Sequence, residues 1–554
     1  MTREIKIRIG GMSCANCVTH VTHALKNIPG VHNVNLPNWR SPHATVVIDD
    51  SVWINELTNA VKDAGYTAEV EEKQLVEPIV VQTEHGNAKL DFDMLVIGGG
   101  SGGFAAAITA SDMGKRVGIV NAGVIGGTCV NVGCVPSKTL IRAAEAWFFA
   151  GHHPFKGLNT APIKLDWTAV RSEKDALVTK MRQNKYVDVL KAYPDIHLIE
   201  GKAAFLKDGS VQVEGKNYRA SKYVIATGAK PRILPIPGLL DAQPLTSTTL
   251  MDLEKLPKSL IILGGRAVAL ELGQTMQRLG VEVLILQRSN TLVPDHEPEI
   301  GRAIQEYLEQ EGVTILTGVQ IEQVSRNGGI TTVTARMRGQ TREYKAEQIL
   351  VALGRQPNTE GMGLENVGVQ LDMNGAVVVN EYQQTTDPNI FATGDVTPNP
   401  EYVYVAAAGG ALAARNALEG NQKPLDLSTL PGVIFTDPQI ATVGLTKADA
   451  IRQGYQVTAQ TLPLEYVPRA QASRDTRGFI KMVATEDTGR ILGVHLLAAE
   501  GGEVIQTATL AVKFGLKLSD LTDTLFPYLT QVEGLKLAAL SFSKDVEKLS
   551  CCAT

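Results

Sequence analysis

Hydrophobic and polar positions alternate with two different periods along the first 70 residues. Ile5, Ile7 and Ile9 alternate with charged residues, which is the period of two expected of a half-buried strand. The later elements predicted in the same way are a helix over 18–28, strands over 31–36, 44–48 and 66–70, and a helix over 52–64. The resulting order β-α-β-β-α-β predicts a small ferredoxin-like unit.

A second pattern begins at Phe92, after a polar, aperiodic stretch. Here an apolar strand leads into a glycine-rich turn, a helix of small residues and another strand, ending near Val120. The same succession returns over 259–286. Two such β-α-β units imply two nucleotide-binding sites. Beyond Pro431 the pattern predicts a third region, with strands at 479–483 and 491–495 and helices at 502–514 and 532–542.

These patterns predict an α/β protein with two Rossmann-like nucleotide-binding domains and an α+β interface domain, preceded by a ferredoxin-like βαββαβ metal-binding domain. The predicted boundaries are 1–70 for the ferredoxin-like domain, 71–90 for a linker, 91–250 and 351–430 for the two parts of the first nucleotide-binding domain, 251–350 for the second, and 431–554 for the interface domain with a C-terminal cysteine tail.

Composition narrows the partners and the location of the protein. The chain of 554 residues has a formal net charge of −5 and no basic block, which argues against nucleic acid or an anionic membrane as the main partner. We find no apolar run long enough for membrane insertion, and the N-terminal segment lacks the apolar core of a secretory signal. We therefore expect a cytoplasmic protein.

The first glycine-rich turn contains Gly98, Gly100 and Gly103 between a strand and a helix. The first glycine permits the tight turn, the second permits close approach of a pyrophosphate, and the third permits close packing of helix on strand. An acidic residue is expected at the end of the next strand to hold a ribose, but Asn121 stands there. Asparagine can still hydrogen-bond a hydroxyl, without the charge.

The second turn, which starts at Gly264 and Gly265, departs further from the usual pattern. Arg266 occupies the position of the second glycine, where its side chain would either contact a phosphate or obstruct it. The following strand ends in Gln287-Arg288, with no acid to bind a ribose 2′-hydroxyl. This favours NADPH over NADH, with Arg288 near the 2′-phosphate. The alternative is that Arg288 is only a solvated surface charge.

The six cysteines form three close pairs: Cys14 and Cys17, Cys129 and Cys134, Cys551 and Cys552. In a reducing compartment such pairs indicate redox or metal chemistry rather than a structural disulfide framework. The loop between the central pair can close a disulfide or present both sulfurs to one metal ion. Cys134 comes just before Pro136, at the start of a predicted helix, where the helix dipole favours a thiolate.

The two outer pairs admit several interpretations. The first sits on a Gly-Met-Ser-Cys loop and binds a soft ion through two thiolates, or through a Cys₂His₂ cluster with His20 and His23. The terminal pair is interpreted as a binding site for a soft metal ion, as a regulatory disulfide or as a redox relay.

The string GGTCVNVGCVPSK (126–138) resembles the redox-active disulfide of the flavin disulfide reductases, the family of glutathione reductase and dihydrolipoamide dehydrogenase. The segments YVIATGAKP (223–231), ILVALGRQPN (349–358), TTDPNIFATGDV (385–396) and VIFTDPQIATVG (433–444) carry the resemblance over the rest of the chain. It implies that FAD is bound in the first nucleotide domain, with Asp395, Thr128 and Gly228 among its contacts. It also implies a Lys138–Glu271 ion pair beside the flavin, with Cys134 facing the flavin and Cys129 as the outer, exchanging thiol. The family is homodimeric, and the partner's C-terminal domain completes each active site.

The C-terminal region distinguishes branches of this family. Disulfide-reducing members carry a histidine near the end of the chain as the proton donor to the leaving thiolate, but no histidine follows His495 here.

The segment FPYLT, which contains Tyr528, together with LSCC resembles mercuric reductases, and the loop up to Cys17 resembles heavy-metal-associated domains. This implies NADPH-dependent reduction of thiol-bound Hg(II) to Hg(0) and mercury resistance, with Tyr528 near the ion and all three cysteine pairs as metal ligands. Hg(II)-thiolate complexes and a mercury transporter or carrier protein are the implied partners. The rivals are an NAD(P)H-dependent reductase of a small organic disulfide and a metal carrier with a regulatory flavin module.

Overall fold

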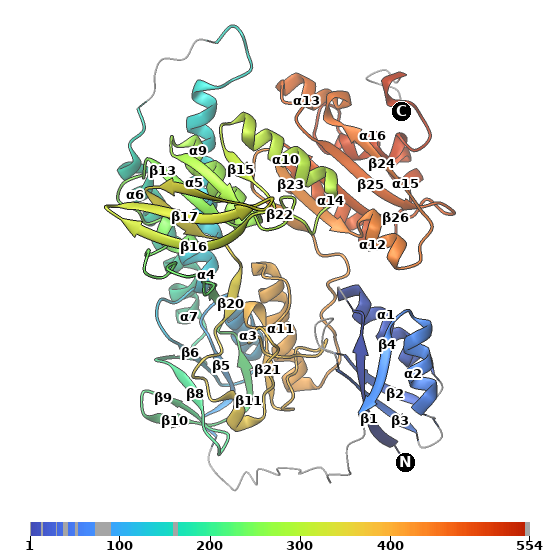
Figure 1. Ribbon diagram of the computed structural model, residues 1–554. Helices are drawn as coiled ribbons and strands as arrows, with labels where there is room; N and C mark the ends of the chain where they lie inside the picture. The colour runs from blue at the N-terminus through green and yellow to red at the C-terminus, as the bar shows by residue number, and fades with distance from the viewer. Residues whose placement is uncertain are drawn as a thin grey trace.

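The computed structural model describes residues 2–12, 15–28, 30–36, 43–49, 52, 54–71, 90–158 and 164–548. The N-terminal unit is a four-stranded antiparallel sheet in the order β2-β3-β1-β4 with two helices (Figure 1). Its elements are β1 (Thr2–Gly10), α1 (Ala15–Lys26), β2 (Val31–Asn35), β3 (His43–Asp49), α2 (Ile54–Asp63) and β4 (Thr67–Glu71). Ile7 and Ile9 are buried and Arg8 between them is exposed, as the alternation predicted. The order of these elements confirms the predicted ferredoxin-like unit.

The first nucleotide-binding unit is built on a parallel sheet in the order β21-β11-β5-β6-β7. Its strands and two central helices are β5 (Phe92–Ile97), α3 (Ser101–Asp112), β6 (Val117–Asn121), β7 (Ile196–Glu200), β11 (Ala220–Ile225), β21 (Ile390–Ala392) and α11 (Val403–Glu419). The small residues predicted in α3 let α11 pack directly against it, since a Cβ on Gly410 would lie 2.1 Å from the carbonyl oxygen of Gly102. A strand 165 residues beyond β11 thus completes the sheet that β5 begins.

A helical excursion between β6 and β7 carries the central cysteines. It consists of α4 (Gly127–Val132), α5 (Cys134–Gly151), α6 (Trp167–Arg182), a π-helical turn (Gln183–Val187) and α7 (Asp188–Ala192). Gly133 breaks α4 from α5, with φ −124° and ψ −113°. A Cβ at Gly133 would lie 2.9 Å from the carbonyl oxygen of Thr128, so glycine is required for the two helices to meet this closely.

The second nucleotide-binding unit repeats the parallel design in the order β15-β14-β13-β19. Its elements are β13 (Ser259–Leu263), α9 (Ala267–Arg278), β14 (Glu282–Leu286), α10 (Pro298–Gln310), β15 (Thr314–Leu316) and β19 (Gln348–Val351), with an antiparallel sheet of β16 (Gln320–Asn327), β17 (Ile330–Met337) and β18 (Gln340–Ala346) beside them. Smaller elements are α8 (Ser247–Leu250) and the strands β8 (Ala203–Phe205), β9 (Val211–Val213), β10 (Lys216–Tyr218), β12 (Ala229–Pro231) and β20 (Arg355–Pro357).

The C-terminal unit is an antiparallel sheet in the order β22-β23-β26-β25-β24. Its elements are β22 (Gly432–Ile434), β23 (Gln439–Gly444), α12 (Lys447–Arg452), β24 (Val457–Pro463), α13 (Pro468–Ser473), β25 (Phe479–Thr485), β26 (Ile491–Ala498), α14 (Gly501–Lys513), α15 (Leu518–Asp523) and α16 (Glu533–Leu540). In Figure 1 α10 lies alongside this sheet, where the second and third units meet. Within the described part of the chain, no helix combines the length and apolar character that crossing a bilayer needs.

We expect Gly103→Ala to destabilise the first nucleotide-binding unit, because the added Cβ would lie 1.9 Å from the carbonyl oxygen of Gly98. Overpacking against backbone costs about 1–3 kcal/mol, which should lower the thermal midpoint measured by circular dichroism. Gly100→Ala, compared with it in the FAD-free protein because Gly100 is also a predicted contact of the cofactor, is the matched control: its Cβ would meet nothing closer than the Gly127 Cα at 3.5 Å. Equal melting of the two variants would contradict this view of the turn.

Candidate active site

The α4–α5 junction brings Cys129 and Cys134 together. Cys129 lies in α4 and is half-buried, whereas Cys134 is the first residue of α5 and is exposed. The two sulfurs are not joined in a disulfide but are hydrogen-bonded to each other. Because α5 begins at Cys134, the predicted helix start is confirmed. The two cysteines form a dithiol.

The two thiols of this pair differ in acidity. The hydrogen bond from Cys129 lowers the pKa of Cys134 to about 7, helped by the charge of Lys138 and opposed by desolvation from surrounding atoms. The same hydrogen bond, with burial, raises the pKa of Cys129 above its ordinary value. Cys134 is therefore the sulfur that carries the negative charge, and the proton stays on Cys129.

Lys138 lies one helical turn beyond Cys134 and forms the predicted ion pair with Glu271. Its Nζ donates to Glu271 Oε2 at 2.6 Å, and Glu271 is almost fully buried in α9. Lys138 Nζ also lies 4.7 Å from the centre of the Phe435 ring. The first nucleotide unit, the second unit and the loop after β22 thus meet at one lysine.

Two tyrosines that the sequence analysis missed lie close to the cysteine pair. Tyr186, in the π-helical turn, is bonded through its hydroxyl to Ser101 Oγ at 3.1 Å. Tyr404, in α11, donates to the carbonyl oxygen of Pro431 and stacks on Tyr402 with ring centres 5.1 Å apart. Burial chiefly raises the pKa of both Tyr186 and Tyr404, and the charge on Cys134 adds to the effect. No motif marks these tyrosines; only the fold places them here.

The residues of the first glycine-rich turn fit a bound dinucleotide. Gly98 has φ 123°, and its Cβ would lie 2.2 Å from the carbonyl oxygen of Ala226, so this turn excludes other residues. Gly100 is the N-cap of α3, whose amides face any anion placed there. Gly228, also predicted at FAD, has φ 68° and open space around it.

Asp395 follows β21 and lies beside an arginine with an unused donor. Arg355 Nε is 3.5 Å from Asp395 Oδ2, and this buried nitrogen has no hydrogen-bond partner in the structure. Burial raises the pKa of Asp395, and the charge of Arg355 opposes this effect. The unpartnered donor of Arg355 beside Asp395 and the glycine turn together fit a bound FAD, and the contact at Asp395 stays a prediction.

Asn121 and Arg266, the two residues that depart from the usual nucleotide-binding pattern, each make a contact close to their own turn. Asn121 donates to the carbonyl oxygen of Gly123 at 2.7 Å, which leaves its amide oxygen for a ligand. Arg266 forms an ion pair with Asp295 across the turn that Gly264 and Gly265 begin. Burial chiefly lowers the pKa of Arg266, and the charge of Arg288 adds to the effect, so the two guanidinium groups lie near each other. Close like charges of this kind suit a phosphate ligand.

The remaining predicted residues lie in other parts of the chain. Cys14, Cys551 and Cys552 fall outside the described residues, and Cys17 is buried in α1. Tyr528 is 53% exposed in the loop before α16, which Figure 1 shows well away from α4. No group of three or more histidine, cysteine or acidic side chains able to hold a metal ion occurs among the described residues, so Cys129 and Cys134 offer a two-sulfur site.

Comparison with known proteins identifies the family to which this architecture belongs. The family model described as pyridine nucleotide-disulphide oxidoreductase matches residues 92–410, its dimerisation domain matches 430–539, and the heavy-metal-associated domain matches 6–67. Mercuric reductase from Staphylococcus aureus is 44% identical over 99% of both chains. Mercuric reductase from Shigella flexneri is 40% identical over 99% of both, and that from Streptomyces lividans is 44% identical over 84% of this chain and 99% of its own.

Solved structures with the same fold include the HOCl-induced flavoprotein disulfide reductase RclA from Escherichia coli. It is 30% identical, with a TM-score of 0.73, over 82% of this chain and 100% of that one. A Cu(II) complex of the same reductase has a TM-score of 0.74 at 30% identity, over 82% and 99% of the two chains.

We expect the alkylation rate of Cys134 in the reduced protein to fall about tenfold per pH unit below its pKa near 7, because protonation removes the nucleophilic thiolate. Lys138→Met should move the midpoint to higher pH, since it removes a cation that favours the thiolate. Peptide-resolved mass spectrometry after iodoacetamide treatment reads Cys134 alone. A midpoint above pH 8.5 in the parent, unmoved by Lys138→Met, would contradict the assignment.

Proposed function

This chain belongs to the pyridine nucleotide-disulphide oxidoreductases, among the mercuric reductases, and from this premise we propose that it reduces thiolate-bound Hg(II) to elemental mercury with electrons from NADPH. The observation that carries the proposal is the hydrogen-bonded pair of Cys129 and Cys134 with Lys138 beside it, in a chain that matches mercuric reductases over 99% of its length. Mercury detoxification is the corresponding biological role.

The cysteine pair binds the ion by thiol exchange. Thiolate is a soft ligand and Hg(II) a soft ion. Cys129, the outer thiol, meets the incoming complex first and displaces one of its thiols, to which the Cys129 proton is transferred. Cys134, whose pKa is lowered to about 7, then displaces the second thiolate. Two electrons delivered to this bis-thiolate complex give Hg(0) and return both sulfurs as thiolates. The neutral product is not retained by anionic ligands.

FAD and NADPH are the cofactors, and when bound they supply the electron pair in the form of a hydride passed from NADPH to FAD. We assign FAD contacts to Gly98, Gly100, Gly103, Asn121, Thr128, Gly228 and Asp395. Lys138, held by Glu271, would present its positive charge to the bound flavin. We assign NADPH contacts to Gly264, Gly265 and Arg288, with the arginine at the 2′-phosphate.

Delivery of the ion involves the two outer cysteine pairs. We assign capture from small thiols, or from a mercury transporter or carrier protein, to Cys14 and Cys17. Cys551 and Cys552 of the partner subunit then pass the ion to Cys129 and Cys134, with Tyr528 of the partner subunit beside it. The dimerisation-domain match at 430–539 supports a homodimer, and a site shared between the subunits would bring Tyr528 of the partner subunit to the cysteine pair. Each exchange keeps mercury on thiolates, so no free ion is released.

The predicted domain boundaries become part of the proposal: a metal-binding domain over 1–70, FAD domain over 91–250 and 351–430, NADPH domain over 251–350, and interface domain over 431–554. A cytoplasmic location follows from the need for NADPH and for reduced thiols.

The competing function is reduction of a small organic disulfide, favoured by the structural likeness to a flavoprotein disulfide reductase. Such a reaction needs a proton donor for the leaving thiolate. The last histidine of the chain, His495, is only 2% exposed in β26 and is bonded to the carbonyl oxygen of Leu445 at 2.9 Å. It is occupied within the interface sheet, which disfavours the disulfide reaction.

We expect the purified flavoprotein, with excess thiol, to oxidise NADPH with Hg(II) and release mercury vapour, and to show no comparable oxidation with oxidised glutathione or lipoamide. The soft two-sulfur site binds mercury without a proton donor, whereas a disulfide substrate requires one. Loss of absorbance at the NADPH band measures oxidation of the cofactor, and atomic absorption of the gas phase measures the released mercury. Turnover with either disulfide and none with Hg(II) would overturn the proposal.

We expect the double variant Cys551→Ala/Cys552→Ala to lose at least about tenfold in turnover with bulky thiol complexes of Hg(II), because tethered thiolates raise the effective concentration of the incoming ligand. Small complexes that reach Cys129 directly should be reduced at close to the parent rate. The pairing of a bulky and a small complex is the internal control. Unchanged turnover with bulky complexes would remove the tail from the delivery route.

A further inference from the structure

Side chains on one face of α9 form hydrogen bonds with the segment that follows β22. Glu271, Gln274 and Arg278 are spaced three and four residues apart, so they lie along the same side of the helix. Each contacts the Phe435–Asp437 segment: Glu271 Oε1 accepts from the Phe435 amide at 2.9 Å, Gln274 bonds both backbone groups of Asp437 at 2.8 Å, and Arg278 bonds its carboxylate at 2.6 Å. Three side chains on one face of a buried helix thus hold both ends of the three-residue segment, Phe435 and Asp437.

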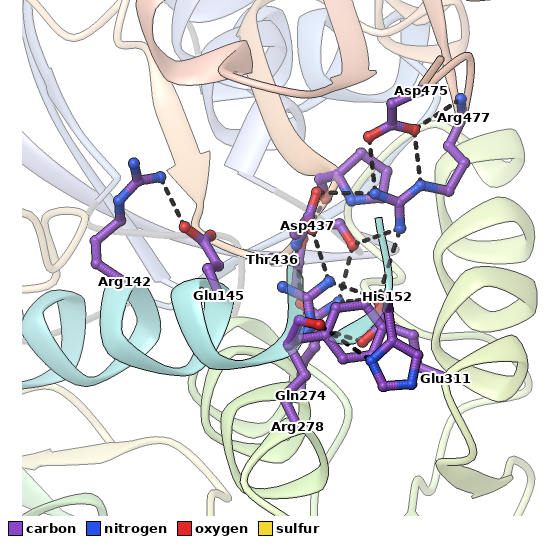
Figure 2. A network of polar contacts seen from close by, with 12 residues as sticks. Arg142, Glu145, His152, Gln274, Arg278, Glu311, Thr436, Asp437, Asp475 and Arg477 are labelled. Atoms are coloured by element: carbon purple, nitrogen blue, oxygen red, sulfur yellow. Dashed lines mark hydrogen bonds and ion pairs between the residues drawn. The ribbon is translucent and has the colours of Figure 1, made fainter. Parts of the chain in front are cut away.

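Asp437 is the most heavily bonded residue of this segment. Figure 2 shows its carboxylate between two arginines: Arg278 donates to Oδ2 at 2.6 Å and Arg477 to Oδ1 at 3.1 Å. Glu311 and Asp475 balance the arginines at the edges of the network. Asp437, Gln274 and Arg278 are all less than 10% exposed. In such surroundings a charged hydrogen bond with a missing partner is costly, so the arrangement is rigid.

The rigid end at Asp437 fixes the other end of the segment at the catalytic lysine. Two residues earlier, the Phe435 amide holds one oxygen of Glu271, and the Phe435 ring lies 4.7 Å from Lys138 Nζ. The second oxygen of Glu271 accepts from Lys138 at 2.6 Å. Lysine has a long flexible side chain that loses much conformational freedom when it is fixed. Its placement therefore depends on the groups that hold Glu271 and the aromatic ring.

We propose that Asp437 is a positioning residue for Lys138: clamped by Gln274 and Arg278, it holds Phe435 against Glu271 and Lys138 and so sets where the ammonium group stands relative to the flavin. The inference rests on the proposed function only in that FAD lies beside Lys138. Asp437 touches neither substrate nor cofactor in this account. It acts through Phe435, and its effect should appear in a property of the flavin, not only in stability.

The test compares Asp437→Asn with Asp475→Asn in the full-length holoenzyme, without mercury. Both changes remove one negative charge from the same network and both remove a bond to Arg477, but only Asp437 also binds α9. The measurements are the midpoint potential of the bound flavin and the thermal midpoint. Lys138→Met gives the direction and the full size of the shift caused by losing the ammonium group.

We expect Asp437→Asn to lower the flavin potential in the same direction as Lys138→Met, by a smaller amount, because a less well-held cation stabilises the reduced flavin less. Loss of a nearby negative charge alone would raise the potential, so the sign separates positioning from simple electrostatics. Asp475→Asn should lower the thermal midpoint without lowering the potential. An unchanged or raised potential in Asp437→Asn, or equal lowering in both variants, would overturn the proposal.

A second variant keeps the test valid if Asp437→Asn loses its flavin. Gln274→Met removes both hydrogen bonds to the Asp437 backbone without changing any charge. It should lower the potential in the same direction, and no shift would overturn the proposal. Because mercury is absent from every measurement, failure to reduce Hg(II) would leave this result intact, and failure here would leave mercury reduction intact.

Discussion

The ion pair between Lys138 and Glu271 joins parts of the chain that are 133 residues apart, and the active site depends on it. Lys138 belongs to the helix that begins at Cys134, and Glu271 belongs to the first helix of the second nucleotide-binding unit. The backbone amide of Phe435, from the third unit, takes the remaining oxygen of the same carboxylate. A single buried carboxylate of the second unit thus takes its partners from the first and third units, and leaving it unpaired would cost several kcal/mol.

The hydrogen bond between the two cysteines, helped by the charge of Lys138, explains their unequal chemistry. Cys129 and Cys134 are of the same residue type and five positions apart, yet one holds the proton and the other the charge. The glycine break between α4 and α5 brings the sulfurs into hydrogen-bonding contact, and Lys138 adds a positive charge on one side. A soft thiolate beside a protonated neighbour suits stepwise exchange with a metal-thiol complex. A disulfide substrate would need a proton donor as well, which the buried His495 does not supply.

The local periodicities predicted most of the fold because each depends on a few neighbouring residues. The alternation at Ile7 and Ile9 and the turn at Gly98 are dictated by side-chain period and backbone sterics, and both are present as expected. Local patterns do not predict contacts between segments that are distant in the sequence. Nothing near Tyr186 or Tyr404 indicates that they approach the cysteines, because a π-helical turn and a helix from the far end of the sheet bring them there. The Lys138–Glu271 pair was predicted from family resemblance alone. The terminal cysteines, Cys551 and Cys552, lie outside the described residues, so their role stays a prediction.

The most direct measurement of the central claim is the number of mercury atoms released as vapour for each NADPH consumed, in an anaerobic vessel with excess thiol. Reduction of Hg(II) at the Cys129–Cys134 pair takes one electron pair for each atom and leaves both thiolates unchanged, so the account predicts a ratio of one that stays constant over many turnovers. NADPH consumption without vapour, or vapour that stops after a single equivalent of protein, would contradict it, because the cysteines would then be acting as a reductant or a trap and not as a regenerated site.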